Sequence, residues 1–266
     1  MQVRFWGVRG SVPWATPSGI GHGCNTPCIQ VTDERTGSLL ILDAGSGIVG
    51  FGEGVSPGPV PVLLTHYHWD HLQGLPFFTP LYQPGWEPEI YAPALSTHDP
   101  KWLNTIFRSP FFPVPFDHLP NRPAMHVFER GDMRIGSFEI QSIILNHPGG
   151  AFAFRIRGTV GDLVYATDHE FGEPEFDEPL ADFARDAAAL ILDAHFTPQE
   201  MPQHRGWGHS DWRTCAEFAA AHNVGGLYLF HHKPGRSDQE LVRIRTDARR
   251  IFAATETASE GDRLQL

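Results

Sequence analysis

The chain has 266 residues, of which 41% are hydrophobic and 12% aromatic, so it carries enough apolar material for a large packed core. Its 20 basic and 31 acidic residues give a formal net charge of −11. This balance disfavours nucleic acid as a partner, because phosphate backbones are held by Lys and Arg. The composition also excludes a disordered or collagen-like chain.

The three cysteines, Cys24, Cys28 and Cys215, are too few for a disulfide framework, and an odd number fits a reducing compartment. We interpret Cys24 and Cys28 as buried thiols. Residues 1–13 lack the apolar stretch of a signal peptide, and no run in the chain is as long and apolar as a membrane span. The sequence therefore predicts a cytoplasmic protein with no membrane segment.

Short strand-like runs dominate the first two-thirds of the chain. They occupy residues 3–8, 28–32, 38–44, 61–65, 89–92, 125–129, 138–145, 151–157 and 162–167. Helical patterns follow at residues 70–78, 95–107, 210–223 and 237–255, the last opening with a capping-box sequence, SDQE. Two further buried strands are expected at residues 188–194 and 225–230.

This order of elements suits two sheets packed face to face with helices outside, built as one domain over residues 1–266. Residues 108–123, RSPFFPVPFDHLPNRP, carry five prolines and three phenylalanines and are expected to form an ordered loop. Such a loop is either a cover for the core or the rim of a pocket. Its apolar surface could also be buried in a homodimer.

The segment LLTHYHWDH, residues 63–71, ends an apolar run with three histidines and an aspartate. His66 and His68 are two apart in extended chain and point to one side. Asp70 and His71 follow at a turn and face the same volume. Imidazole and carboxylate ligands suit Zn²⁺, Mn²⁺ or Fe²⁺, and four groups in one loop exceed the needs of one catalytic ion. The cluster therefore predicts a site for two ions.

A site for two ions needs further ligands at the ends of other strands. His147 follows the apolar run IIL, Asp168 follows LVYA and Thr167, and His231 directly follows LYLF. Each residue alone is more often a buried polar group than a ligand. Together with the cluster at 66–71 they complete a candidate metal centre, in which the carboxylate of Asp168 could bridge two ions.

With these motifs the chain resembles the metallo-β-lactamase-fold metallohydrolases. The matching segments are DAGSG at 43–47, THYHWDH at 65–71, NHPGG at 146–150, TDHE at 167–170 and FHHKP at 230–234. The resemblance implies an α/β fold, a four-layer αββα sandwich with two divalent ions at one sheet edge. It implies one ion on His66, His68 and His147, the other on Asp70, His71 and His231, and Asp168 between them.

The segment RGWGHSDW, residues 205–212, separates the reactions that this fold hosts. His209 resembles a histidine of the phosphodiesterase branch, which includes tRNase Z and the cyclic-phosphate phosphodiesterase of phosphonate breakdown. The resemblance implies that it protonates the departing oxygen or holds the phosphoryl group. The alternative is a neighbour of a helix cap. We predict His209 and Asp70 as catalytic residues, the latter also being a ligand.

Several polar residues near these motifs have two interpretations each. Asp43 would orient a ligand imidazole or simply form a turn. Asn25 could face the site, although a turn role is favoured, and Glu170 could bind a ligand or substrate or lie on the surface. Asp211 could orient His209 or cap a helix. Asp193 and His195, at the end of a further strand, could support the ligands.

The leading hypothesis is a metal-dependent phosphodiesterase acting on a small cyclic or linear phosphodiester. Some tRNase Z enzymes carry a basic tRNA-binding arm between the residues matching His147 and Asp168, and here those residues are only 21 apart (168 − 147). The alternatives are a tRNA 3′-processing endonuclease, a lactone or thioester hydrolase, and a metal-bound sensor without turnover. The sequence leaves the choice among Zn²⁺, Mn²⁺ and Fe²⁺ open.

Overall fold

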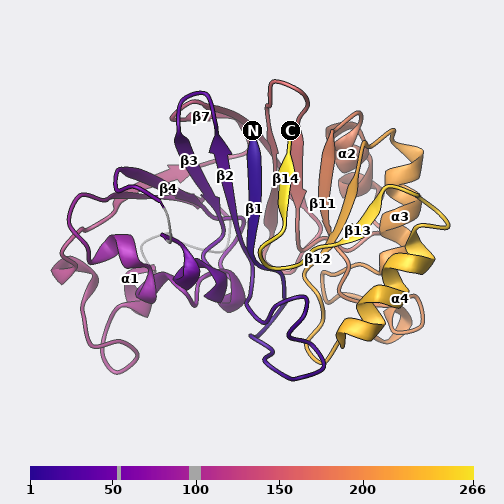
Figure 1. The fold of residues 1–266 in the computed structure, drawn as a ribbon, viewed down its shortest axis with the longest axis horizontal. Coiled ribbons are helices and arrows are strands. Elements are labelled where there is room, and N and C mark those ends of the chain that lie inside the picture. Colours follow the sequence, from indigo (N-terminus) through magenta and orange to yellow (C-terminus); the bar gives the residue numbers. More distant parts are fainter. Residues whose placement is uncertain (53–54, 96–102) are drawn as a thin grey trace.

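The computed structural model describes residues 1–52, 55–95 and 103–266, and these form two mixed β-sheets of seven strands each (Figure 1). The first sheet has the order β14-β1-β2-β3-β4-β5-β6. Its strands are β1 (Gln2–Gly7), β2 (Cys28–Asp33), β3 (Ser38–Leu42), β4 (Pro59–Leu63), β5 (Glu87–Pro93), β6 (Ala124–Phe128) and β14 (Arg263–Gln265). Strands β3 to β6 run parallel to one another.

The second sheet has the order β13-β12-β11-β10-β9-β8-β7. Its strands are β7 (Gly131–Ile135), β8 (Phe138–Leu145), β9 (Ala151–Ile156), β10 (Leu163–Ala166), β11 (Ala189–Asp193), β12 (Leu227–Phe230) and β13 (Thr255–Thr257). Strands β10 to β13 are parallel, so their carboxyl ends meet at one edge of the sheet.

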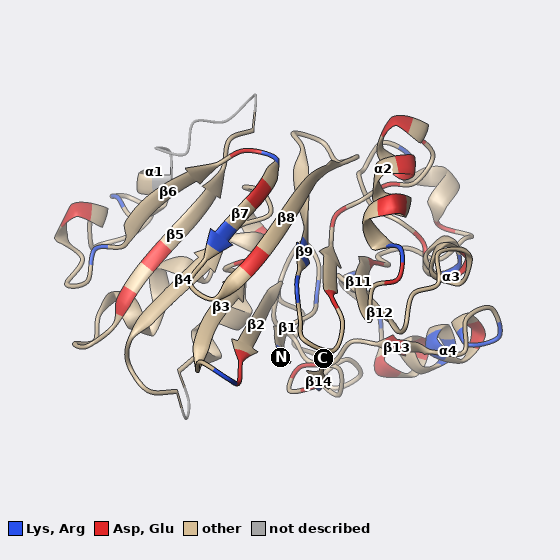
Figure 2. Cartoon of the chain, turned by 90° about the horizontal axis from the view of Figure 1, so that it is seen from above, with Lys and Arg blue, Asp and Glu red and all other residues tan. Residues whose placement is uncertain are grey.

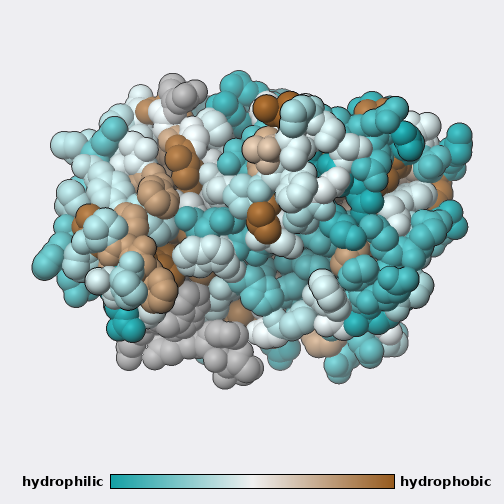
Figure 3. All heavy atoms as spheres, turned by 90° about the horizontal axis from the view of Figure 1, so that it is seen from below, coloured by the Kyte–Doolittle hydropathy of each residue, from teal (hydrophilic) through white to brown (hydrophobic). Residues whose placement is uncertain are grey.

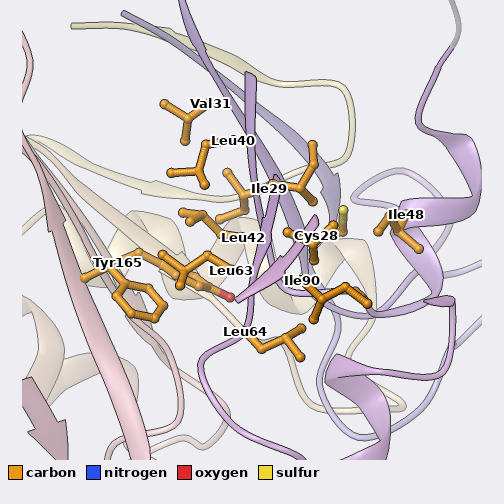
Figure 4. Close-up of a cluster of buried hydrophobic side chains, with 14 of the residues drawn as sticks. Cys28, Ile29, Val31, Leu40, Leu42, Ile48, Leu63, Leu64, Ile90 and Tyr165 are labelled. Carbon is orange, nitrogen blue, oxygen red and sulfur yellow. The ribbon is translucent and has the colours of Figure 1, made fainter. Parts of the chain in front are cut away.

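Apolar side chains of both sheets fill the space between them. Figure 4 shows part of this core, where Ile29, Leu42 and Leu63 of the first sheet face Tyr165 of the second. The strands β3, β4 and β10 are rich in Val, Ile and Leu because both of their faces are covered, as is usual for strands with parallel neighbours.

Helices cover the outer faces of the two sheets. The helices α2 (Pro174–Ala184), α3 (Trp212–Ala221) and α4 (Asp238–Ala248) flank the second sheet, while α1 (Leu103–Ile106) and several 3₁₀ turns lie beside the first (Figure 1). The predicted αββα sandwich is therefore confirmed. The capping box of α4 is also present, with Ser237 and Glu240 bonded reciprocally.

The prediction of a helix at 70–78 is wrong. The chain there makes only short 3₁₀ turns, at Trp69–His71, Leu75–Phe77 and Thr79–Leu81. Gly74 and Pro76 explain this, because proline removes a backbone donor and glycine lowers helix propensity. Of the helix expected at 95–107, residues 96–102 lie outside the described part, and α1 forms its end.

Among the described residues, three strands and one α-helix were not predicted: β7, β13, β14 and α2. The strands β13 and β14 have only three residues each, and α2 carries an internal proline, Pro179, and few buried side chains. Such short or weakly patterned segments give little periodic signal. Cys28 is buried as expected, whereas Cys24 is partly exposed. Within the described residues, no helix has both the length and the apolar character needed to cross a membrane.

Candidate metal centre

The predicted ligands come from loops that follow β4, β8, β10 and β12, and the structure brings them into one cluster. The sequence predicts three side chains as ligands of each ion, and we call these two sets the first group and the second group. The first group is His66, His68 and His147, and the second group is Asp70, His71 and His231.

Asp168 lies between the two groups and turns one oxygen toward each. Its Oδ2 is 3.7 Å from His66 Nε2 and 3.6 Å from His147 Nε2. Its Oδ1 is 3.3 Å from His71 Nε2 and 3.4 Å from His231 Nε2. A carboxylate in this position can bind two ions at once.

Within each group the ligand atoms are close enough to share an ion. In the first group His68 Nδ1 lies 2.9 Å from His147 Nε2. In the second, Asp70 Oδ2 is 3.1 Å from His231 Nε2 and 3.6 Å from His71 Nε2. The candidate ligand atoms of the first group and Asp168 all lie within 4.8 Å of one another, as do those of the second group.

Two buried nitrogens show that these residues fit metal ions. The Nε2 atoms of His66 and His71 are inaccessible to solvent and have no hydrogen-bond partner, although both face Asp168. A buried polar atom without a partner is destabilising, and a cation in each group would satisfy the nitrogen of that group. Burial also lowers the pKa of His66 and lowers that of His147 to about 4, which favours the neutral imidazole that metal ions bind.

Asp43 orients one imidazole of each group, His71 by a direct contact and His66 through Thr65. Its Oδ2 is 2.9 Å from His71 Nδ1. Thr65 connects it to the first group, because the Thr65 hydroxyl donates to Asp43 at 3.0 Å and lies 3.0 Å from His66 Nδ1. Tyr165 adds a further bond at 2.8 Å. These contacts leave each Nε2 free to face the cluster.

Three residues of the centre have left-handed backbone conformations. Asp43, Asp168 and His231 have φ values of +61°, +58° and +57°, each shortly after a buried parallel strand. Such values are uncommon for residues other than glycine, and each costs of order 1–3 kcal/mol. The surrounding fold therefore stabilises a local backbone geometry that aims these side chains at the cluster.

His209 lies beside the first group and is held by Asp193. The Nδ1 of His209 is 2.6 Å from Asp193 Oδ2 and 3.9 Å from Asp168 Oδ2. Burial would lower the pKa of His209, but the Asp193 carboxylate outweighs it and raises the pKa to about 9. This environment favours a protonated imidazole, as a proton donor requires.

The sequence left the roles of Asp193 and His195 open. Asp193 is the last of the five buried residues of β11 and His195 follows two residues later, so the signal available from sequence was the polar pair at the end of this strand. The ring of His195 stacks on that of His209, with centroids 4.6 Å apart.

Glu170 supports the loop that carries His209. Its carboxylate accepts hydrogen bonds from the backbone N–H groups of Gly206 at 2.9 Å and Gly208 at 2.8 Å. The carbonyl of Gly208 is in turn 2.8 Å from His147 Nδ1. Glu170 is buried and thus acts on the first group through the backbone of this loop.

Two other sequence candidates lie outside the cluster. The side chain of Asn25 contacts Glu260 at 3.1 Å and Ser46 at 3.0 Å, so it supports a turn. Asp211 caps α3 by accepting hydrogen bonds from the backbone N–H groups of Arg213 and Thr214.

Comparison with known proteins identifies a family and several similar folds. A model of the beta-lactamase superfamily domain matches residues 42–232. Ribonuclease Z of Bradyrhizobium sp. (strain ORS 278) is 26% identical over 99% of both chains. Among solved structures, the metallo-beta-lactamase fold protein YhfI from Bacillus subtilis superposes with a TM-score of 0.73 at 19% identity, covering 99% of this chain and 98% of that one. A diphosphatase from the PhnP family also gives 0.73, at 18% identity and coverages of 100% and 97%.

Proposed function

The chain belongs to the β-lactamase superfamily of metal-dependent hydrolases, and on this premise we propose that it cleaves a small cyclic or linear phosphodiester. The observation that carries the proposal is the position of His209, which is bonded to Asp193 and lies beside Asp168. A lactone or thioester hydrolase has no need of a histidine in this place, whereas phosphodiester cleavage releases a poor leaving group that must be protonated.

We further propose that the two groups of ligands hold two divalent ions, Zn²⁺ or Mn²⁺ with Fe²⁺ as a further option, and that Asp168 lies between them. Two ions so held would lower the pKa of a bound water and neutralise charge on the phosphoryl oxygens. Asp70 would serve as a ligand and, through its carboxylate, help to orient the attacking water.

His209 would supply the proton for the departing oxygen. Because its Nδ1 is bonded to Asp193, the Nε2 atom is the one left for proton transfer. Cleavage of the P–O bond leaves the electron pair on the departing oxygen, which takes this proton. Asp193 fixes the ring and stabilises its charged form.

Two features favour a small substrate over tRNA. The 20 residues between His147 and Asp168 (168 − 147 − 1) contain the antiparallel strands β9 and β10 and their short connection. In the part of the chain that the structure describes, Lys and Arg are scattered among Asp and Glu, with the largest basic stretch on α4 (Figure 2). Neither feature resembles a basic arm for RNA.

Two exposed tryptophans suit a substrate that carries a flat ring. Trp69 lies between His68 and Asp70 in the chain, and Trp207 lies two residues before His209. They are 57% and 60% exposed. Bases stack on such side chains with about 1–3 kcal/mol each, so we favour a nucleoside phosphodiester such as a cyclic nucleotide.

A tRNA 3′-processing activity is the second candidate, because Ribonuclease Z relatives align over nearly the whole chain. The deciding experiment gives the metal-loaded protein four substrates: bis-p-nitrophenyl phosphate, a cyclic nucleotide, a precursor tRNA and a lactone. Turnover of the first two supports the proposal. Cleavage of precursor tRNA alone would favour the second candidate, and turnover of the lactone alone would reject both.

We make three further proposals, on the domain organisation, the cellular location and the oligomeric state. We propose that residues 1–266 form one metallo-β-lactamase-like domain, supported by a single buried cluster that joins both sheets. A cytoplasmic location is supported by the three free cysteines.

A homodimer through the Pro- and Phe-rich loop at residues 108–123 is supported by Phe111, which is 74% exposed. Figure 3 shows hydrophobic residues gathered over the half of the molecule that carries α1.

A further inference from the structure

His195 is a buried imidazole that the proposed reaction does not yet use. It is 5% exposed and lies two residues after the last residue of β11. Its backbone N–H donates to Asp193 Oδ1 at 2.9 Å, while the other oxygen of Asp193 is bonded to His209. Asp193 therefore fixes the backbone of His195 and the ring of His209 together.

The ring of His195 is held by the backbone of a predicted metal ligand. Its Nδ1 lies 3.0 Å from the carbonyl oxygen of His231. A carbonyl oxygen can only accept, so Nδ1 of His195 carries a hydrogen. Gly10 packs against the other side of the His195 ring. A Cβ atom at residue 10 would lie 2.9 Å from His195 Nδ1 and 2.4 Å from ring atoms of His231. His195 has no room to shift toward Gly10.

The face of this ring lies against the proton donor. The rings of His195 and His209 are 4.6 Å apart at 20°, and those of His209 and His231 are 4.9 Å apart at 25°. The imidazole of His209 is therefore packed by His195 and by His231, and is hydrogen-bonded to Asp193. A ring confined in this way cannot rotate away from the cluster without displacing His195.

We propose that His195 is a positioning residue, which holds His209 in the orientation needed to protonate the departing oxygen. The inference rests on the proposed function. His195 does not touch the substrate; it acts on His209 by its ring face, whose centroid lies 4.6 Å from that of the His209 ring. General acids are sensitive to placement, since a shift of about 1 Å can cost roughly 100-fold in rate.

Two substitutions separate these contacts. His195→Phe keeps an aromatic face against His209 and removes the ring N–H. His195→Asn keeps a donor near the position of Nδ1 and removes the ring. Rates are measured on bis-p-nitrophenyl phosphate, whose phenolate leaves without help, and on a 2′,3′-cyclic nucleotide, whose alkoxide needs a proton. Metal content and melting temperature are recorded for every variant.

We expect His195→Asn to lower kcat on the cyclic nucleotide by about tenfold or more while sparing the phenyl ester, in line with the placement argument. His195→Phe should keep most of the wild-type rate. In a background with His209→Ala, adding His195→Asn should cause no further loss. If both variants lose rate equally on both substrates, or if the losses add to that of His209→Ala, the proposal is overturned.

A second readout does not depend on phosphodiester turnover. The Nδ1–H proton of His209, in its short bond to Asp193, should give a far-downfield NMR signal in the wild type. This signal should persist in His195→Phe and broaden or vanish in His195→Asn. If it persists in both, His195 does not position His209. A protein that shows the expected signals but cleaves no phosphodiester would reject the proposed function and leave the positioning role standing.

Discussion

The carboxylate of Glu170 accepts a hydrogen bond from the backbone N–H of Gly208 at 2.8 Å, and the carbonyl of the same glycine lies 2.8 Å from His147. Gly208 has a φ of +82°, and a Cβ on it would lie 2.2 Å from His147 Nδ1. The backbone of one residue, Gly208, thus connects a buried acid to a predicted metal ligand. The close approach requires a glycine at this position.

Glu170→Gln should therefore weaken both the fold and the first group of ligands. The amide keeps one acceptor for backbone N–H groups that now use both oxygens, and loss of a charged hydrogen bond costs about 1–3 kcal/mol. Thermal unfolding of the metal-free protein and Zn²⁺ titration measure the two effects. Glu178→Gln, on an exposed residue of α2, is the matched control. An equal effect of both variants would show that Glu170 supports neither the fold nor the first group.

Asp43→Asn should lower metal affinity about 10- to 100-fold, as expected when a residue that orients metal ligands is altered. The amide has one acceptor oxygen, whereas Asp43 now serves Thr65, His71 and Tyr165. Asparagine tolerates the left-handed backbone at this position. Tyr165→Phe removes one bond to Asp43 and leaves that to His71, so its affinity should fall much less. Competition with a chelator gives both values.

His209→Ala should leave the metal content unchanged, because His209 belongs to neither group of ligands. Loss of a general acid typically costs about 10²- to 10⁴-fold in rate. This loss should be seen in kcat with an alkoxide leaving group and be small with p-nitrophenolate. If both substrates lose equally while the metal stays bound, His209 does not act as an acid.

Glu200 should make stability depend on pH in the acid range. Burial would raise its pKa, but Lys233, Arg236 and the backbone N–H of Thr197 lower it from 4.5 to about 2. The folded state therefore favours the charged form, and this contribution is present above pH 4.5 and is lost as pH falls toward 2.

The variant Glu200→Gln removes this dependence. Its melting temperature should lie below that of the wild type at neutral pH, and the gap should narrow steadily once the pH drops below 4.5, the ordinary pKa of the side chain. A gap that stays constant down to the onset of acid unfolding would show that the ion pairs with Lys233 and Arg236 add nothing.

The sequence predicted best where local pattern and burial coincide. The strands that end at Leu63, Leu145, Ala166 and Phe230 are strongly apolar, and the polar residues after each stand out against them. The structure brings all of these polar residues into one cluster. Parallel strands bring their ends to one edge, which makes such residues predictable neighbours.

The other features of the site depend on contacts between residues far apart in the chain, which residue patterns do not reveal. The partnership of Asp193 with His209 spans 16 residues, and that of Glu170 with Gly208 spans 38. Neither spacing reveals a hydrogen bond. The left-handed backbone of Asp43 could not be expected from residue type, since the surrounding packing imposes it. The helix predicted at 70–78 is absent because Gly74 and Pro76 prevent it, although the spacing of the apolar residues there is typical of a helix.

Metal stoichiometry tests directly whether the two groups of ligands hold two ions. The protein is stripped, reloaded with Zn²⁺ or Mn²⁺, dialysed and analysed, alongside His147→Ala and His231→Ala, which each remove a ligand from a different group. We expect two ions per chain in the wild type and about one in each variant, since loss of a ligand weakens its own ion most. Fewer than two ions in the fully reloaded wild type would contradict this expectation.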